Sequence, residues 1–238
     1  MIRGFSIAVL VLFLCGCDNK GAPLAQPAAI PPQTVHVSTP DEWKAALLST
    51  YTERDVKDKG DGVTTFTAVF KSAGEPVRVA FGSRDAFRKL RFYIPGIYAD
   101  LDIGPYLKTY ISLSDNGSPL LFLAPYYFGK NGWLFMSKVS VMVDGDVVLE
   151  RDFQGKQVNR NAHGYGVEER YDFIASDDDI AALRKISSSS KVLIRLTGSK
   201  GYVNLGGADD KNVQREIIDA LAIYDRMSGS LNGHIPPQ

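Results

Sequence analysis

The stretch 133–153, WLFMSKVSVMVDGDVVLERDF, contains two β-strand patterns joined by a two-residue turn. Residues 133–143 and 146–153 are rich in β-branched and other apolar side chains. Asp144-Gly145 between them is the strongest hairpin signal in the chain, because both residue types tolerate the positive φ that such turns need. Outward from this hairpin, period-two patterns dominate the sequence. The stretch therefore predicts a domain built mainly from antiparallel β-structure.

Further strands are expected on both sides of the hairpin, at 63–71, 77–81, 106–112, 120–128, 166–175, 191–196 and 202–205. Residues 54–62 are charged and Gly-rich, which predicts a loop. Residues 84–91 fit either a short helix or an exposed connection. We expect these strands to form an antiparallel sheet or a sandwich.

Three helices are predicted from N-cap signals followed by apolar residues at helical spacing. Thr39 precedes Pro40 and stands three residues before Glu42, which is a capping box. Ser176 with Asp179 forms a second capping box, and Asp209 can cap a third helix. The fold class is therefore α+β: an antiparallel sheet or sandwich with about three peripheral helices.

The first 17 residues have the pattern of an export signal. Arg3 supplies a positive charge, and residues 5–14, FSIAVLVLFL, form an apolar run too short to cross a hydrocarbon core of roughly 30 Å. The run ends in Leu14-Cys15-Gly16-Cys17, which resembles the lipobox of bacterial lipoproteins. The resemblance covers only this segment. It implies that residues 1–16 are removed and that Cys17 is acylated, with palmitate among its chains, and anchors the protein in a membrane.

The residue after the lipobox bears on the location of the protein. Asp18 resembles the signal that retains enterobacterial lipoproteins in the inner membrane. This implies a lipid-anchored protein of the bacterial inner membrane whose domain faces the periplasm. The outer membrane is the alternative if the Asp18 rule does not apply.

Four segments follow from these patterns. Residues 1–16 are the signal peptide, and 17–38 combine the lipidated Cys with a Pro- and Ala-rich tether. Residues 39–228 form a single globular periplasmic domain, and 229–238 form a flexible tail. The membrane, reached through the N-terminal lipid, is thus the first expected partner.

Composition and charge exclude several classes of function. The chain of 238 residues has 27 basic and 27 acidic side chains, whereas nucleic-acid-binding proteins usually have a strongly basic surface. Both cysteines lie in the lipobox, so we expect no disulfide, thiol catalysis or Cys metal site in the domain. No nucleotide-binding or metalloprotease motif occurs, and the sequence predicts no metal and no cofactor.

One hydrolase arrangement stays open. Since His36 and His234 lie in the predicted tether and tail, His163 is the one histidine left for the domain. With Glu168 it could form an acid/base pair, and Arg160 could hold an anion of an envelope substrate. A structural loop and a surface salt bridge are the simpler interpretations of the same residues.

The densest feature is aromatic and has two interpretations. Tyr126, Tyr127, Phe128 and Trp133 could pack in the core and across strands, as aromatic side chains in sheets commonly do. Alternatively, they form an exposed recognition patch, since Tyr and Trp are common at contact surfaces. The patch favours a non-catalytic binding domain that engages an envelope protein. A lipid-binding interior is a third possibility.

Overall fold

The computed structural model describes residues 36–71, 73–96, 105–115, 117–189, 191–205, 211–231 and 234–235. All of them belong to one compact unit, Thr34–Gln238. The predicted signal peptide, Cys17, Asp18 and most of the tether lie outside the described residues.

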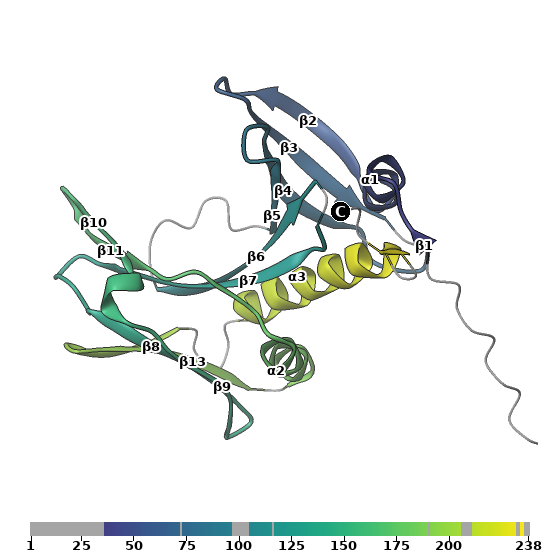
Figure 1. Ribbon diagram of the computed structural model, residues 1–238. Helices are drawn as coiled ribbons and strands as arrows, with labels where there is room; N and C mark the ends of the chain where they lie inside the picture. Colours follow the sequence, from purple (N-terminus) through teal and green to yellow (C-terminus); the bar gives the residue numbers. More distant parts are fainter. Residues whose placement is uncertain are drawn as a thin grey trace, which may run out of the picture. The chain divides into compact units, whose positions relative to one another are not determined.

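Nine strands form the larger of two antiparallel sheets (Figure 1). Eight of them follow the order β10-β11-β7-β6-β5-β4-β3-β2, and β12 also pairs with β7. Their bounds are β2 (Thr52–Asp58), β3 (Val63–Phe70), β4 (Arg78–Asp85), β5 (Leu90–Pro95), β6 (Tyr106–Ser114), β7 (Leu120–Gly129), β10 (Asn159–His163), β11 (Gly166–Arg170) and β12 (Phe173–Ile174). From β2 to β7, each strand pairs with its neighbour in the sequence.

Four strands form the smaller sheet, in the order β14-β13-β8-β9. They are β8 (Met136–Val143), β9 (Asp146–Asp152), β13 (Val192–Gly198) and β14 (Gly201–Leu205), and all pairs are antiparallel. A single 3-10 turn, η2 (Gly155–Gln157), follows β9 and leads back to the larger sheet. The hairpin predicted at residues 133–153 thus contributes two of these four strands.

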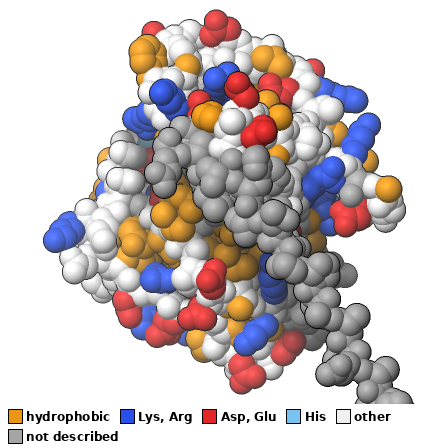
Figure 2. Space-filling model, turned by 45° about the vertical axis from the view of Figure 1, so that its right-hand side comes forward, with side chains coloured by type: hydrophobic (Ala, Val, Ile, Leu, Met, Phe, Trp, Pro, Cys, Tyr) orange, Lys and Arg blue, Asp and Glu red, His pale blue; other side chains and the backbone are white. Residues whose placement is uncertain are grey.

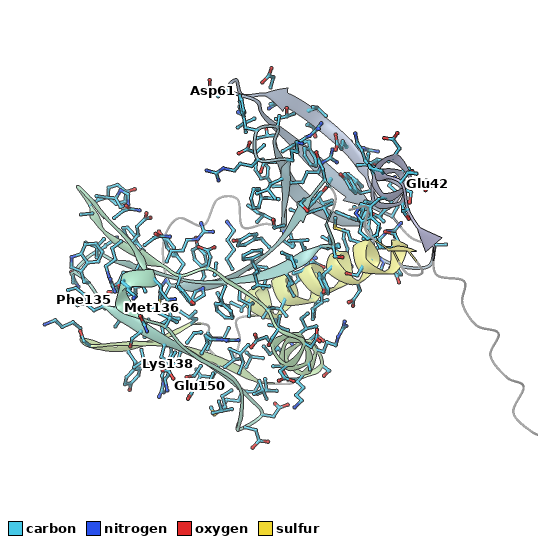
Figure 3. All side chains as sticks on the ribbon, viewed as in Figure 1. Glu42, Asp61, Phe135, Met136, Lys138 and Glu150 are labelled. Atoms are coloured by element: carbon cyan, nitrogen blue, oxygen red, sulfur yellow. The ribbon has the colours of Figure 1, made fainter. Side chains whose placement is uncertain are left out.

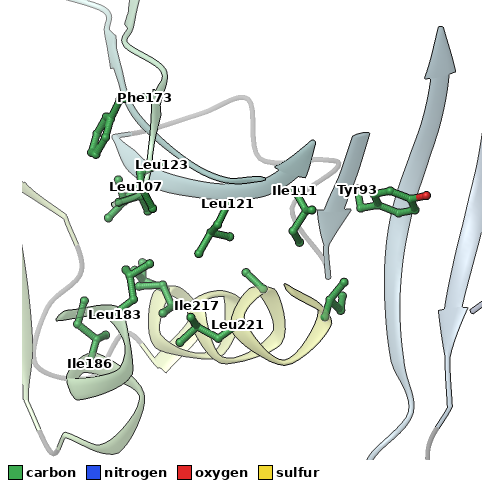
Figure 4. Close-up of a cluster of buried hydrophobic side chains, with 14 of the residues drawn as sticks. Tyr93, Leu107, Ile111, Leu121, Leu123, Phe173, Leu183, Ile186, Ile217 and Leu221 are labelled. Atoms are coloured by element: carbon green, nitrogen blue, oxygen red, sulfur yellow. The ribbon is translucent and has the colours of Figure 1, made fainter. Parts of the chain in front are cut away.

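Three helices pack around the sheets: α1 (Pro40–Leu48), α2 (Asp177–Ser188) and α3 (Lys211–Ser230). Helix α3 contacts β5, β6, β7, α1 and α2. Figure 4 shows Ile217 and Leu221 of α3 in one cluster with Ile111 and Leu121 of the sheet, and all four side chains are buried. Side chains of both sheets and all three helices join one core cluster, so the α+β class predicted from the sequence is confirmed.

Two of the three signals predicted for helix starts, and the signal for the hairpin turn, are confirmed; the third cap, Asp209, lies outside the described residues. Thr39 and Ser176 are N-caps with complete capping boxes, in which Glu42 and Asp179 bind back to the cap backbone. Asp144 and Gly145 have φ of 50° and 106°, and the residues on either side of them are paired. These signals are local, which is why sequence alone locates them.

Two segments differ from the sequence prediction. Residues 54–62, expected as a loop, fall largely in β2, an edge strand whose seven side chains are all exposed. Residues 84–91 form no helix: they contain the end of β4, an exposed turn at 86–89 and the start of β5, so the exposed connection is confirmed only for the turn. Both segments are paired through the backbone with little burial, so no hydrophobic period marks them.

Short strands also occur where the tether and the tail were predicted. Strands β1 (His36–Val37) and β15 (His234–Ile235) pair in parallel, with His36 opposite His234. Helix α3 extends two residues past position 228, to Ser230. Part of each predicted segment is therefore regular backbone.

Candidate binding surface

Strand β7 separates the aromatic residues that the sequence grouped together. Because side chains alternate along a strand, Tyr126 and Phe128 share one face and Tyr127 lies on the other. Tyr126 stacks on Tyr106 with ring centroids 4.5 Å apart. Tyr126 and Phe128 are only 8% and 9% exposed. Their burial favours the packing interpretation over an exposed patch at these two positions.

Trp133 and Phe135 present a different environment, in the segment that enters β8. Trp133 is half-buried, and Phe135 is 41% exposed. The two rings lie 6.3 Å apart. Within the described residues, the indole N–H of Trp133 makes no hydrogen bond. We call residues 133–135 the aromatic segment, since they combine apolar area with a free polar tip.

The backbone of the aromatic segment is strained. Phe135 has a φ of 52°, in the left-handed region that bulky residues rarely adopt. Such a conformation costs on the order of 1–3 kcal/mol and persists only where surrounding contacts hold it. The residue is nonetheless at the surface, so the strain does not serve to bury the ring.

Glu169 of β11 holds this strained backbone in place. Its carboxylate has no solvent exposure and accepts hydrogen bonds from the backbone N–H groups of Leu134, Phe135 and Met136 at 2.7, 2.8 and 2.7 Å. Figure 3 shows Phe135 and Met136 beside the β10–β11 hairpin that carries Glu169. Three consecutive donors on one carboxylate fix both the position and the direction of the segment.

Arg160 of β10 completes the support. Its Nε donates to Glu169 at 3.1 Å, so the buried carboxylate has a counter-charge. Its Nη1 donates to the carbonyl of Gly155 at 2.7 Å, and the guanidinium lies over the Phe135 ring, 5.6 Å from its centroid. Arg160 therefore contacts both the anchor and the displayed ring.

The β13–β14 hairpin closes the other side of the aromatic segment. The backbone N–H groups of Ser199 and Lys200 donate to the carbonyls of Phe135 and Leu134 at 3.3 and 3.2 Å. Gly198 lies so close that a Cβ there would be 2.3 Å from the Leu134 carbonyl oxygen. The aromatic segment is thus held from two sheets and is a rigid surface feature.

The β10–β11 hairpin also brings together two of the three residues considered for catalysis. His163 Nε2 lies 3.4 Å from Glu168 Oε2. Asn161 and the Tyr126 hydroxyl also donate to Glu168. The hydrogen bond from Asn161 is the main reason that the pKa of Glu168 lies below its usual value, against the effect of burial.

Arg160 does not join this pair. Cross-strand partners share a face, and Arg160 is opposite Glu169 whereas Asn161 is opposite Glu168. Arg160 therefore lies on the face of the hairpin that supports the aromatic segment. An anion held by Arg160 would be separated from His163 and Glu168 by the sheet.

Sequence reasoning missed the two residues that define the surface. Glu168 and Glu169 are consecutive on β11 and therefore lie on opposite faces, but the sequence could not show what Glu169 binds. Its partners are backbone groups 33 to 35 residues away. Since almost every residue type has a backbone N–H group, the sequence does not show which ones bind Glu169. Phe135 had no signal beyond its membership of an aromatic-rich stretch.

Three negative findings complete the description of the site. The described residues contain no group of three or more His, Cys, Asp or Glu placed to hold a metal ion. No helix in the described part of the chain is long and apolar enough to span a membrane. Comparison with protein-family models, with curated proteins and with solved structures finds no match.

Proposed function

We propose that the chain is a bacterial lipoprotein, anchored through lipid on Cys17, whose periplasmic domain is a non-catalytic module that binds an envelope protein. The observation that carries the binding role is the strained, exposed Phe135, which Glu169 and Arg160 hold rigidly beside Trp133. Backbone strain of this kind concentrates at functional sites.

The chemistry of the aromatic segment suits a protein partner. Trp and Arg are enriched among the residues that contribute most to protein interfaces, and the interface core is rich in aromatic side chains. Trp133, Phe135 and Arg160 supply such side chains within one contact network. Because the segment is already ordered, binding would cost little further conformational entropy.

The anchor would set where this surface acts. The lipobox ending at Cys17 and the acidic Asp18 support the inner membrane, with the outer membrane as the alternative. More than one acyl chain makes such anchoring stable. The aromatic segment would then be presented to periplasmic proteins near a membrane.

A hydrolase remains the second candidate because His163 and Glu168 lie within 3.4 Å of each other. A histidine and a carboxylate at this distance can share acid/base work. Arg160 lies on the other face of the hairpin, so it cannot hold a substrate anion beside His163 and Glu168. The lipid-binding alternative gains no support from the described core, whose buried side chains form one continuous cluster.

Site-specific photo-crosslinking tests the binding proposal. A photoreactive phenylalanine analogue replaces Phe135 in the full chain, expressed in the native envelope. The matched control carries the analogue at Phe87, which is 83% exposed and distant in the sequence. We expect a discrete crosslinked protein from position 135 and none from position 87, and we expect Trp133→Ala to abolish it.

The same experiment separates the two candidates. The binding proposal fails if position 135 gives no product or the same products as position 87. His163→Ala should leave the crosslinked product unchanged. A deletion phenotype that His163→Ala reproduces and Trp133→Ala does not would instead favour the hydrolase.

A further inference from the structure

A polar cavity is lined by the C-terminal end of α1, the β3–β4 turn and the second half of α3. None of its lining residues belongs to the aromatic segment. Its volume is about 660 Å³, within the range of small-molecule sites. A smaller cavity adjoins it and shares part of its wall. The polar side chains that matter are Ser49, Thr50, Glu75, Arg78, Arg226 and Ser230.

Arg226 is the unusual member of this wall. It lines both cavities and is half-buried, yet it forms no hydrogen bond or ion pair within the described residues. Two nearby acids already have partners, since Asp225 pairs with Arg184 at 2.6 and 2.8 Å and Asp219 pairs with Arg78. The exposed Glu75 also lines both cavities and forms no ion pair with Arg226 within the described residues. None of its nitrogens is among the buried, unpartnered polar atoms of the described residues, so the guanidinium is open to an acceptor from solution.

Arg78 adds a second guanidinium to the same wall. One of its terminal nitrogens binds Asp219, and its Nε is buried away from the cavity. Guanidinium groups match the geometry of carboxylate and phosphate oxygens better than any other side chain. The arginine side of the cavity is therefore suited to an oxyanion.

The same wall also offers acceptors. The hydroxyls of Ser49, Thr50 and Ser230 donate to the helix carbonyls of Ala46, Leu47 and Met227 at 2.6, 2.7 and 2.7 Å. Their protons are thus occupied, and their oxygens can only accept from a ligand. The C-terminal ends of α1 and α3 carry partial negative charge, and exposed Glu75 adds a carboxylate.

We propose that this cavity binds a small oxyanion that also carries hydroxyl or ammonium donors, such as a phosphorylated polyol. Arg226 holds the oxyanion, and the hydroxyl oxygens with Glu75 accept from the donors. Figure 2 shows basic and acidic side chains mixed over the part of the face that is not drawn in grey. Recognition thus rests on the pairing of groups within the cavity and not on a broad positive surface.

Calorimetric titration of the full chain in detergent, at constant ionic strength, tests the proposal. The probes are inorganic phosphate and glycerol 3-phosphate. We expect glycerol 3-phosphate to bind about tenfold more tightly, because it alone supplies the donors. Arg226→Gln should weaken its binding at least about tenfold, and Arg226→Lys should weaken it less.

The matched control is Arg215→Gln, which removes the same charge from an exposed position on α3. It should leave both affinities unchanged, and thermal midpoints of all variants establish that they fold. The proposal is overturned if neither probe binds the wild-type chain, or if Arg226→Gln and Arg215→Gln behave alike. Soluble dihexanoyl phosphatidylglycerol assigns the source: binding equal to that of glycerol 3-phosphate identifies a lipid headgroup, and weaker binding identifies a free ligand.

Discussion

The carboxylate of Glu169 accepts hydrogen bonds from three successive backbone N–H groups. Elsewhere in the fold, the carbonyl groups of a neighbouring strand accept such bonds. A fully buried charge is unfavourable unless hydrogen bonds and a counter-charge compensate for it. Glu169 has both, the counter-charge coming from Arg160. Stability and the geometry of the proposed binding surface therefore depend on the same residue.

Glu169→Gln should destabilise the domain by about 3 kcal/mol, because it removes the charge that three donors and Arg160 require. Urea unfolding followed by circular dichroism measures the change. The matched control is Glu168→Gln on the opposite face, where the carboxylate is partly exposed and the cost should stay below about 1 kcal/mol. Equal costs at the two positions would contradict the role given to Glu169.

Between elements, the packing of α3 on β6 places a second carboxylate in the core. Pairing of β5 with β6 ends at Tyr93 and Ile111, and further along β6 the N–H of Thr109 donates to Glu216 of α3 at 2.9 Å. Glu216 is 3% exposed. Burial raises its pKa from 4.5 to about 7, against the effects of Thr109 and Lys108.

This pKa predicts that Glu216 destabilises the domain as pH rises. The folded chain holds the proton more tightly than the unfolded chain, so unfolding between about pH 4.5 and 7 releases a proton and stability falls as pH increases. The full effect above pH 7 is about 3 kcal/mol. Glu216→Gln keeps the acceptor for Thr109 and should be more stable than wild type at pH 8.

Urea unfolding of both proteins at pH 5 and pH 8 measures this difference. Other titrating groups are common to both chains and cancel in the comparison. The variant should gain stability relative to wild type as pH rises from 5 to 8. A difference that does not change between the two pH values would show that Glu216 is not protonated preferentially in the folded chain.

An element could be predicted from the sequence when the contacts that stabilise it are made between residues close together in the chain. The capping boxes at Thr39 and Ser176 and the turn at Asp144 are made by residues a few positions apart, so their signals are complete within the sequence. Strands β2 and β10 are held by backbone pairing at sheet edges with mostly exposed side chains, so no apolar period identifies them.

The candidate surface follows the same rule. Trp133 was recognised because of its residue type, and His163 and Glu168, five positions apart, were recognised as a possible pair. The strain at Phe135, the three donors on Glu169 and the free Arg226 arise only when segments far apart in the chain meet. Contacts of this kind are set by tertiary packing, which local patterns do not encode.

For the whole molecule, the proposal joins a nearly neutral domain to a lipid anchor. With 27 basic and 27 acidic side chains, the chain has no net charge that would attract it to anionic lipid. Membrane association should therefore depend on the acyl chains and not on the surface of the domain. The two cysteines of the lipobox allow this dependence to be tested by single-atom changes.

Cys17→Ser should abolish labelling by radioactive palmitate and move the protein from the membrane to the soluble fraction, because the acylated sulfur is lost. Cys15→Ser is the matched control: it changes the same atom two residues earlier, in a segment that the lipobox resemblance assigns to the removed signal. It should keep both labelling and membrane association. Sedimentation of envelope fractions with and without high salt completes the test, since an acyl anchor resists salt that would release a charge-bound protein. If Cys17→Ser remained labelled and membrane-bound, the anchor would lie elsewhere and the lipoprotein proposal would be wrong.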